Sequence, residues 1–358
     1  MSSVINYRSN AIVELLESPA EERDEPWLKQ SLQQAIMLEL ATLPPYLCGL
    51  WSIEEPDQES EAFRTIHAIV FDEMSHMALA CNMLTTIGGE PRIADESLVP
   101  KYPGPLPGGV RPGLTVSLTG LTKQALDMYS GIERPDDPVA EDQEEHTSIG
   151  AFYTAILEAF RAQPDLISGT RQLTRDMSSH GEGNDVVALG SLADVEAAVK
   201  IIKEQGEGTT VSPENPFPGN TGELAHFYSF REIFHGRKLI RAFDDPPRFD
   251  FQGAEVPMPR ALPMGTVPAG GWAAGGVPVP DDVRQDLDTF NRHYSSLLRF
   301  LERAWQADQP GTAAQMLNRA VGQMFQLQGP AQDLMRKPLP DGGGKTYGPE
   351  FRFVPEEP

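Results

Sequence analysis

Cysteine and basic residues are both scarce in this chain of 358 residues. The two cysteines, Cys48 and Cys81, fall within apolar helical patterns, so we expect small core residues and not a disulfide framework. Lys and Arg total 29 against 52 Asp and Glu, which gives a net charge of -23. This acidic excess argues against binding to nucleic acid or to an anionic membrane, because their phosphates need Lys and Arg.

Long apolar runs are also missing. No window offers the ~18 uninterrupted apolar residues that indicate a membrane span. The N-terminal stretch MSSVINYRSNAIVELLES has no basic start followed by an apolar run, so we expect no signal peptide. We find no repeat at solenoid periods. The length allows a large core in one or two domains, and the composition suits a soluble cytoplasmic protein.

Residues 63–87 are predicted to form one long helix. Apolar residues recur there at steps of three and four, and Glu73 and His76 lie within the resulting apolar stripe. Side chains three apart on a helix point the same way. A buried carboxylate is costly unless a charged or hydrogen-bonding group meets it, and a metal ion is one such group. Glu-x-x-His on an inward face is the ligand pattern of dinuclear helical bundles, although a single pair more often lies on a surface.

A second acid interrupts the apolar stripe of the preceding helix. That helix is predicted to begin at Asp24-Glu25-Pro26, a capping Asp followed by Pro in the first turn. Glu39 lies midway along its stripe, and Pro44-Pro45 is predicted to kink the helix one turn later. Taken alone, Glu39 is better explained as an acid at the edge of the core that pairs with an Arg or a hydroxyl.

Further helices are predicted over residues 118–129, 148–161 and 192–206, with an acidic loop at 133–146. The third of them ends in Glu204-Gln205-Gly206-Glu207-Gly208. Glycines interleaved with acids permit a backbone path that aims carboxylates inward. Acids are poor neighbours for a helix C-terminus, so this end suits a cation, although a solvated acidic end is the alternative. Glu158 is a weaker candidate, for which solvent exposure is expected.

The next predicted helix, residues 221–242, opens with a second Glu-x-x-His pair, Glu223 and His226. Its Glu232 and His235 are assigned to an outer or surface position. Residues 244–280, rich in Pro, Gly and Ala, are expected to form an ordered strap over the bundle or a lid. Residues 281–307 and 312–328 are predicted to form an antiparallel helical hairpin, followed by an extended tail. The hairpin has no central acid or His, so it is assigned to packing.

The candidate ligands come in a definite order along the chain. A lone Glu precedes the first Glu-x-x-His pair, and a third-helix acid, drawn from three alternatives, precedes the second. In order they are Glu39, Glu73, His76, then Glu158, Glu204 or Glu207, then Glu223 and His226. Two single glutamates and two Glu-x-x-His pairs form the dinuclear site of ferritin-like bundles. Four carboxylates and two imidazoles could coordinate two divalent metals, and iron, manganese and zinc all accept such ligands.

Four blocks of the sequence resemble a known family: LELATLPPYLCGLWSI, FRTIHAIVFDEMSHM, EQGEG and ELAHFYSFREI. They are similar to bacterial ferritin-like proteins related to a domain of the iminophenylpyruvate-dimer-synthase-type enzymes of violacein biosynthesis. The resemblance runs from about residue 25 to 240. It supports five of the candidates as ligands: Glu39, Glu73, His76, Glu207 and His226. Some members are expected to carry an acid where this chain has Ala151. If that acid is a ligand, this chain holds a single metal or a different one.

The sequence therefore predicts an all-α protein, with a ferritin-like four-helix bundle, an appended C-terminal helical hairpin and long Pro/Gly-rich loops. Residues 1–243 are assigned to the bundle and its metal site, 244–280 to the strap, and 281–358 to the hairpin and tail. Without metal, the clustered carboxylates should take up protons, with raised pKa values.

The leading functional hypothesis is a non-haem di-iron oxidoreductase in secondary-metabolite biosynthesis, acting on a small organic molecule such as an aromatic one. The alternatives are an iron-binding or storage protein without organic turnover, and a scaffold with a vestigial site. An enzyme should have a cleft beside the metals, with the strap near its mouth. A storage protein should assemble into a closed cage, for which this long chain is poorly suited. The sequence allows a homo-oligomer without specifying one.

Overall fold

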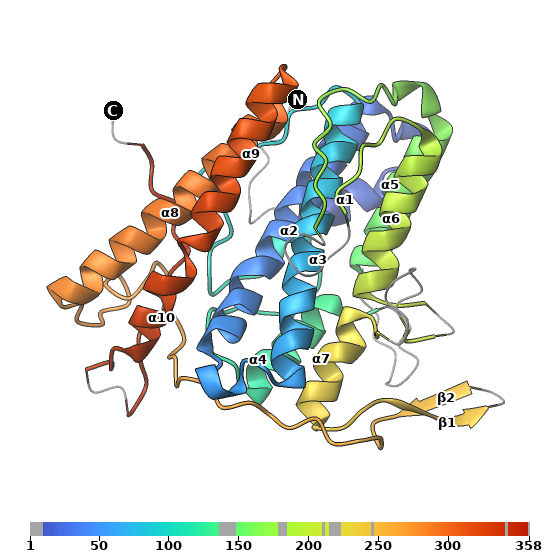
Figure 1. Cartoon of the computed structure of the whole chain (residues 1–358). Coiled ribbons are helices and arrows are strands. Elements are labelled where there is room, and N and C mark those ends of the chain that lie inside the picture. Colours follow the sequence, from blue (N-terminus) through green and yellow to red (C-terminus); the bar gives the residue numbers. More distant parts are fainter. Residues whose placement is uncertain are drawn as a thin grey trace.

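The computed structural model describes residues 10–135, 148–177, 185–209, 212–214, 223–244, 247–340 and 343–356. These residues are mostly helical, which confirms the predicted all-α class (Figure 1). The helices are α1 (Ala11–Glu17), α2 (Glu25–Ser52), α3 (Glu61–Thr86), α4 (Lys123–Glu133), α5 (Ile149–Ala162), α6 (Leu192–Gly206), α7 (His226–His235), α8 (Asp281–Gln306), α9 (Pro310–Phe325) and α10 (Gln328–Arg336). Short 3₁₀ turns lie at Ala20–Glu22, Glu55–Asp57, Pro107–Gly109 and Pro164–Leu166.

The long antiparallel pair α2 and α3 forms the centre of the molecule (Figure 1). Side-chain caps fix where each helix begins: Asp24 accepts from the backbone N–H of Trp27 at 3.1 Å, and Ser60 accepts from Phe63 at 3.2 Å. These caps satisfy amides that have no partner inside the helix. Gly88 follows α3 with a φ of 72°, a conformation that glycine adopts without strain and that commonly ends helices.

Helix α2 continues through Pro44 and Pro45 to Ser52. Pro45 has no N–H, so the carbonyl of Ala41, four residues earlier, loses its helical donor. The hydroxyl of Tyr102 donates to that carbonyl at 2.8 Å. A side chain from a distant loop therefore replaces the missing helical hydrogen bond, and the double proline does not end the helix.

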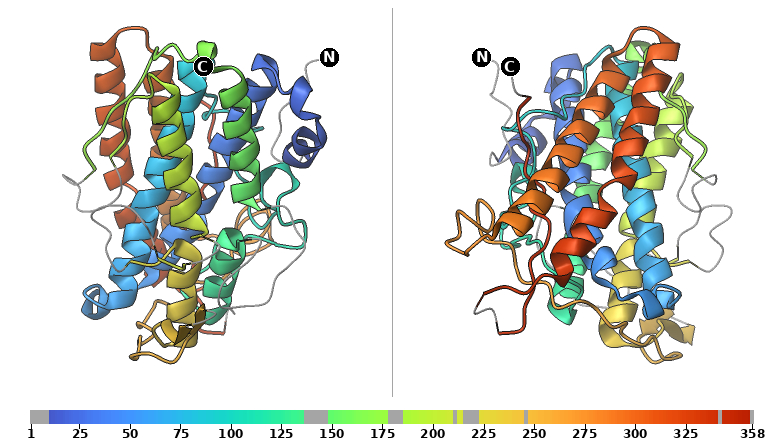
Figure 2. Two further views of the ribbon diagram at one scale, coloured as in Figure 1. Left: turned by 90° about the vertical axis from the view of Figure 1, so that its right-hand side faces the viewer. Right: turned by 60° about the vertical axis from the view of Figure 1, so that its left-hand side comes forward.

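The other two columns of the bundle are each broken into two helices. In the left view of Figure 2, α5 stands above α4 and α6 stands above α7. Helix α5 packs on α6, and α4 packs on α7. The breaks place three side chains at helix ends: Glu133 is the last residue of α4, Gln205 the last but one of α6, and His226 the first of α7. All three ends face the middle of the α2–α3 pair.

Two predicted helices have different bounds in the structure. The helix expected over residues 118–129 begins at Lys123, where Thr122 caps it, and runs on to Glu133. The helix expected over residues 221–242 is limited to α7; residue 221, where it was predicted to begin, lies outside the described residues. Glu223 precedes α7 and lies in an extended segment. The next residue, Leu224, forms an isolated antiparallel β-bridge with Glu214.

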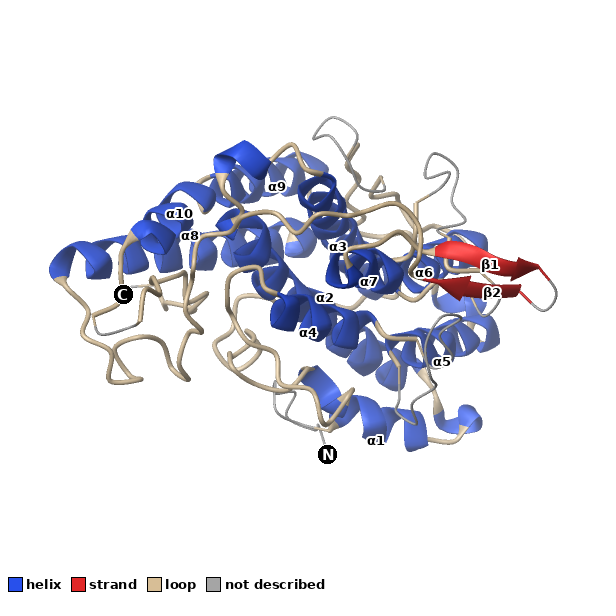
Figure 3. Ribbon diagram, turned by 90° about the horizontal axis from the view of Figure 1, so that it is seen from below, coloured by secondary structure: helices blue, strands red, loops and turns tan. Residues whose placement is uncertain are grey.

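Helix α7 ends at Gly236, which has a φ of 70°. The chain then forms a two-stranded antiparallel ribbon, β1 (Ile240–Asp244) and β2 (Pro247–Asp250), where helix and loop had been predicted. Figure 3 shows the ribbon projecting beyond the helices. The prediction that helix continues to residue 242 is therefore wrong, because the glycine turn ends it about two turns earlier.

The C-terminal hairpin of α8 and α9 is confirmed, and it lies along α2 and α3 on the side away from α5 and α6 (Figures 1 and 2). Helix α10, which had been predicted as tail, follows it, with Pro330 in its first turn where a missing N–H costs nothing. Trp305 of α8 donates its indole N–H to Asn82 of α3 at 2.9 Å. The Asn82 amide in turn donates to the carbonyls of Leu173 and Val187 at 2.7 and 2.8 Å.

The described part of residues 244–280 is an ordered strap along the base of the bundle. The amide of Leu262 donates to the carbonyl of Ser52 at 2.7 Å, and that of Val267 donates to Leu118 at 3.0 Å. Cys48 and Cys81 are buried and free, as expected. Among the described helices, none has the length and apolar character needed to cross a membrane.

Candidate metal centre

Three carboxylates and two imidazoles converge in the middle of the bundle. They form two overlapping groups, Glu39 with Glu73 and His76, and Glu133 with Glu73 and His226. Within each group, one potential ligand atom from every residue lies within 4.8 Å of the others. All five residues are at most 4% exposed. Glu73 belongs to both groups and is the one carboxylate that they share.

Both histidines turn the same ring nitrogen toward Glu73. The Nδ1 atom of His226 lies 2.9 Å from Glu73 Oε1, and that of His76 lies 3.5 Å from the same oxygen. The outer carboxylates lie farther away: Glu39 Oε2 is 4.0 Å from His76 Nδ1, and Glu133 Oε2 is 3.8 Å from His226 Nδ1. The arrangement is therefore two similar halves around one shared carboxylate.

The opposite ring nitrogens are held by a second set of buried side chains. His76 Nε2 bonds to Gln205 Oε1 at 2.8 Å, and His226 Nε2 bonds to Asp72 Oδ2 at 3.3 Å. Gln205 also donates its amide to Asp72 Oδ1 at 3.4 Å, which joins the two halves. Because the amide and carboxylate oxygens accept at Nε2, each neutral imidazole leaves Nδ1 as a lone pair directed at the cluster. Metal-ligating histidines are oriented in this way.

Hydroxyl groups orient the three carboxylates. Tyr153 of α5 donates to Glu39 Oε1 at 2.5 Å, and Tyr46 of α2 donates to Glu133 Oε1 at 2.5 Å. Thr42 donates to Glu73 Oε2 at 2.8 Å. Burial, and then the neighbouring carboxylate, raises the pKa of both tyrosines, so their hydroxyls stay protonated and keep donating.

The protonation pattern of the cluster is uneven. Burial, and then the charge of Glu73, raises the pKa of Glu39 to about 8 and also raises that of Glu133. Burial alone would raise the pKa of Glu73 too, but the adjacent imidazoles of His226 and His76 hold it well below its usual range. Two of the carboxylates therefore follow the expectation that clustered acids take up protons, and the central one does the opposite.

The two imidazoles have raised pKa values. Burial opposes the charged form of His76, but the hydrogen bond and charge of Glu73 outweigh it and raise the pKa to about 9. The pKa of His226 is also raised against the effect of burial, by Asp72, Glu133 and Glu73. Without metal, protons on the imidazoles and outer carboxylates thus supply the positive charge that the buried cluster needs.

One buried atom tests whether a metal ion fits here. Nδ1 of His226 makes no hydrogen bond with the described residues, although Glu73 Oε1 is 2.9 Å away. Both residues belong, with Glu133, to a group whose ligand atoms lie close enough together to hold an ion. A cation between them would satisfy both. Together with three carboxylates and two imidazoles, this donor set suits iron, manganese or zinc.

The structure brings four of the seven residues predicted from the sequence into the cluster: Glu39, Glu73, His76 and His226. The other three lie elsewhere. Glu204 is 3.9 Å from Lys200 Nζ and lines the groove between α5 and α6. Glu207 accepts from the backbone N–H of Gly150 at 2.8 Å, so it neutralises the N-terminus of α5. Glu223 is exposed before α7 begins, where a spacing of three no longer aligns it with His226.

The weaker candidates also lie outside the cluster. Glu158 has a side chain that is 59% exposed and lies 3.5 Å from Arg23, in line with the exposure expected for it. Glu232 is buried but bonds to Lys238 at 2.6 Å, and His235 stacks on Phe251. Ala151 lines the groove between α5 and α6.

Sequence reasoning missed Glu133 because the predicted helix stopped at residue 129. A signal was present: Leu126, Tyr129 and Glu133 follow at helical spacing, so extending the helix by one turn would have placed an acid on its apolar face.

Gln205 and Asp72 were missed for another reason. Gln205 is an uncharged amide, so it does not stand out as a metal-site residue. Asp72 directly precedes Glu73, which was already the candidate ligand of that turn.

The sequence profile described as ferritin-like matches residues 32–235, which is more than half of the chain and includes the whole cluster. The chain belongs to the ferritin-like family. Among solved structures, a ferritin-like protein from Caulobacter vibrioides is similar to it, with a TM-score of 0.57 and 20% sequence identity. The match covers 91% of this chain and 97% of the other, and at this identity it shows the fold alone. No functionally curated protein matches the chain.

Proposed function

We propose that this ferritin-like protein is a non-haem dinuclear metal enzyme, an iron-dependent oxidoreductase that acts on a small organic molecule. The observation that carries the proposal is the position of Glu73 between two Glu–His pairs. A structural acid needs one partner, but Glu73 has an imidazole nitrogen on either side and a carboxylate beyond each. Two ions, one held by each group with Glu73 common to both, would account for all five side chains.

Charge supports two ions in this pocket. With the histidines neutral, the cluster carries three carboxylate charges, which two divalent ions would balance with one positive charge left over. Among the described residues, α6 contributes the amide of Gln205 and not a fourth carboxylate. A ligand set with fewer charges leaves coordination positions for exogenous molecules. When bound, two iron ions would supply one- and two-electron redox chemistry toward dioxygen.

The residues around the cluster would fix its geometry and exclude water. Tyr46 and Tyr153 hold the outer carboxylates, each with one oxygen engaged and the other turned toward a histidine. Asp72 and Gln205 hold the imidazole rings in the tautomer that leaves Nδ1 free to bind. Such supporting hydrogen bonds keep ligands in position when charge changes at the metals.

We place the substrate in the groove of about 630 Å³ between α5 and α6. Thr154 and Glu204 line this groove. They are adjacent in sequence to Tyr153 and Gln205, which are buried and bond to the cluster, so the groove lies next to the cluster. The strap residues tied to α2 lie at the base of the bundle, so the strap is not needed as the mouth of this groove. An aromatic substrate is supported by the resemblance of four sequence blocks to the violacein-type enzymes.

Iron storage is the alternative, and the C-terminal hairpin argues against it. Helices α8 to α10 cover one flank of α2 and α3, a surface that a bare bundle would have free for assembly into a shell (Figure 2). A storage protein should also accept many ions per chain. The proposed site accounts for two.

Iron titration distinguishes these functions. Protein purified without oxygen should bind Fe(II) to a plateau near two ions per chain, and exposure to air should not raise that plateau. The loaded protein should then consume dioxygen faster with a suitable member of a panel of small aromatic acids and amines, with an oxidised product detected by mass spectrometry. Uptake far beyond two ions, in a closed shell seen by light scattering, would favour storage. Trace metal alone after reconstitution would contradict both.

A further inference from the structure

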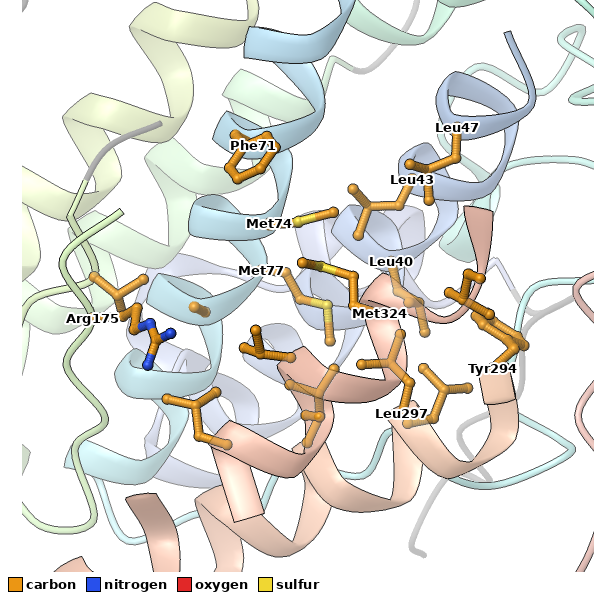
Figure 4. A pocket seen from close by; sticks show the side chains of 18 of the residues that line it. Leu40, Leu43, Leu47, Phe71, Met74, Met77, Arg175, Tyr294, Leu297 and Met324 are labelled. Carbon is orange, nitrogen blue, oxygen red and sulfur yellow. The ribbon is translucent and has the colours of Figure 1, made fainter. Parts of the chain in front are cut away.

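A second cavity lies on the other side of α3, at the seam between the bundle and the C-terminal hairpin (Figure 4). We call it the seam cavity. Its volume is about 140 Å³. It is bounded by α2 and α3 on one side and by α8 and α9 on the other. Residues that line it include Leu43, Phe71, Met74, Met77, Ala320 and Met324.

The seam cavity and the metal cluster use different sides of α3. Met74 and Met77 follow Glu73 and His76 directly in the chain, and each step along a helix turns the side chain by about 100°. The cavity is therefore separated from the cluster by the body of α3. A ligand in it would not be a ligand of the metals, and its binding does not depend on the function proposed above.

The walls of the seam cavity are almost entirely apolar. Arg175 stands at one edge, where its guanidinium donates to Asn318 of α9 at 3.1 Å. That contact joins the segment before α6 to the hairpin across the seam. A polar group of a ligand would lose its hydrogen bonds to water here and find few in return, so the walls select against charge.

Helix α9 covers the cavity incompletely. Its inner residues Leu317, Val321 and Met324 remain partly exposed, whereas Ala320 between them is fully buried. The small side chain at position 320 leaves space that a larger one would fill. Three methionines at the wall add adaptability, because unbranched thioether side chains reshape around guests of different form. An apolar cavity of roughly 150 Å³ in another protein is known to stay dry and to bind benzene.

We propose that the seam cavity is a binding site for a compact, uncharged, apolar molecule, of the size of a substituted benzene or a short alkyl chain. The ligand would occupy the space above Ala320 and be held by contact with Met74, Met77 and Met324. Binding would remove apolar surface of both the ligand and the cavity wall from water. The bound ligand would contact α9 and α3 at the same time.

Methionine methyl NMR on the full-length chain tests the proposal, with toluene as probe and benzoate as its charged counterpart. Signals are assigned by single Met→Leu substitutions. Toluene should shift the signals of Met74, Met77 and Met324 saturably, while Met264 and Met335, buried elsewhere, stay in place. Benzoate should leave all five unchanged.

Two substitutions on α9 provide the matched comparison. Ala320→Leu should fill the cavity and weaken toluene binding at least tenfold. Ala314→Leu, on the exposed side of the same helix, should bind as wild type does. If Ala320→Leu does not fold, Ala78→Leu fills the same cavity from α3. Toluene that leaves the three signals unmoved, benzoate that shifts them equally, or a filled variant that binds as tightly as wild type would each overturn the proposal.

Discussion

The two sides of α3 present opposite problems of burial. One side carries Glu73 and His76 into a cluster with too much charge for a protein interior, and the other carries Met74 and Met77 to a cavity with too few atoms. The charged side is densely connected by hydrogen bonds and holds the candidate metal ligands. The apolar side makes no demand for hydrogen bonds and leaves a cavity of about 140 Å³ between its side chains. One helix can tolerate both because its two sides are separated by its own backbone.

Replacement of Glu73 should have the largest effect, because it removes the residue shared by both halves of the charged side. Glu73→Ala should abolish binding of both metals. It should also destabilise the metal-free protein by roughly 3–5 kcal/mol, since two protonated imidazoles lose their common carboxylate. Metal analysis and urea unfolding measure the two effects. Glu158→Ala, at an exposed position, is the control. Retention of one full equivalent of metal in Glu73→Ala would contradict a bridging role.

A pair of methionines on α3 tests the apolar side. Met83 is fully buried in the bundle core, whereas Met77 borders the seam cavity. Truncation to Ala in a packed core costs about 2–5 kcal/mol, and less where neighbours are already missing. We expect Met83→Ala to lie at the upper end of that range and Met77→Ala at the lower end, by thermal or urea unfolding. Equal losses would mean that the cavity collapses around Met77 in solution.

The pH dependence of stability should differ between metal-free and metal-loaded protein. His76, with its pKa raised to about 9, stabilises the fold fully below its unfolded value near 6.5, and this contribution is lost as the pH rises to 9. Glu39, with its pKa raised to about 8, likewise binds its proton more tightly in the folded state, so stability falls as the pH rises through 8.

Metal-free protein should therefore lose stability on the order of 1–3 kcal/mol between pH 6.5 and 9. Metal replaces these protons, so the loaded protein should show a flatter profile and should bind metal more tightly at the higher pH. Melting curves of both forms across this range provide the check. A metal-free profile that rises with pH would contradict the assignment of protons to His76 and Glu39.

The smallest effect separates two interpretations of Glu207. As a metal ligand, which the sequence suggested, its replacement by Ala would lower the metal content sharply. Its contact with the Gly150 N–H predicts instead that Glu207→Ala keeps the metals and loses roughly 1 kcal/mol through the start of α5. Metal content and melting temperature, measured on one preparation, decide between them.

Sequence alone specified the long helices well because their patterns run for several turns and their caps are local. Asp24 followed by Glu25-Pro26 marks the start of α2 by a local pattern that needs no knowledge of the rest of the chain. It also found Glu39, Glu73, His76 and His226, since acids and imidazoles that interrupt apolar stripes stand out.

The remainder of the candidate site depends on where broken helices meet. Glu133 and His226 come together only because α4 ends and α7 begins at the same level of the bundle. Neither boundary follows from helical periodicity, and β1 begins where the pattern still allowed helix. Glu223 was chosen by a spacing that has meaning only inside a helix, and its segment is extended.

The bond between Trp305 and Asn82 has a consequence for how the protein is made. These residues are 223 positions apart, and at ribosomal rates of roughly 5–20 residues per second the partner of Asn82 emerges some 10 to 45 s after Asn82 itself. Throughout that interval the methionine-lined side of α3 has no hairpin to cover it. The nascent chain thus exposes an apolar surface, which can associate with other apolar surfaces, for most of its synthesis. Expression at high ribosome load should therefore favour aggregation, and chaperones that hold apolar segments should relieve it.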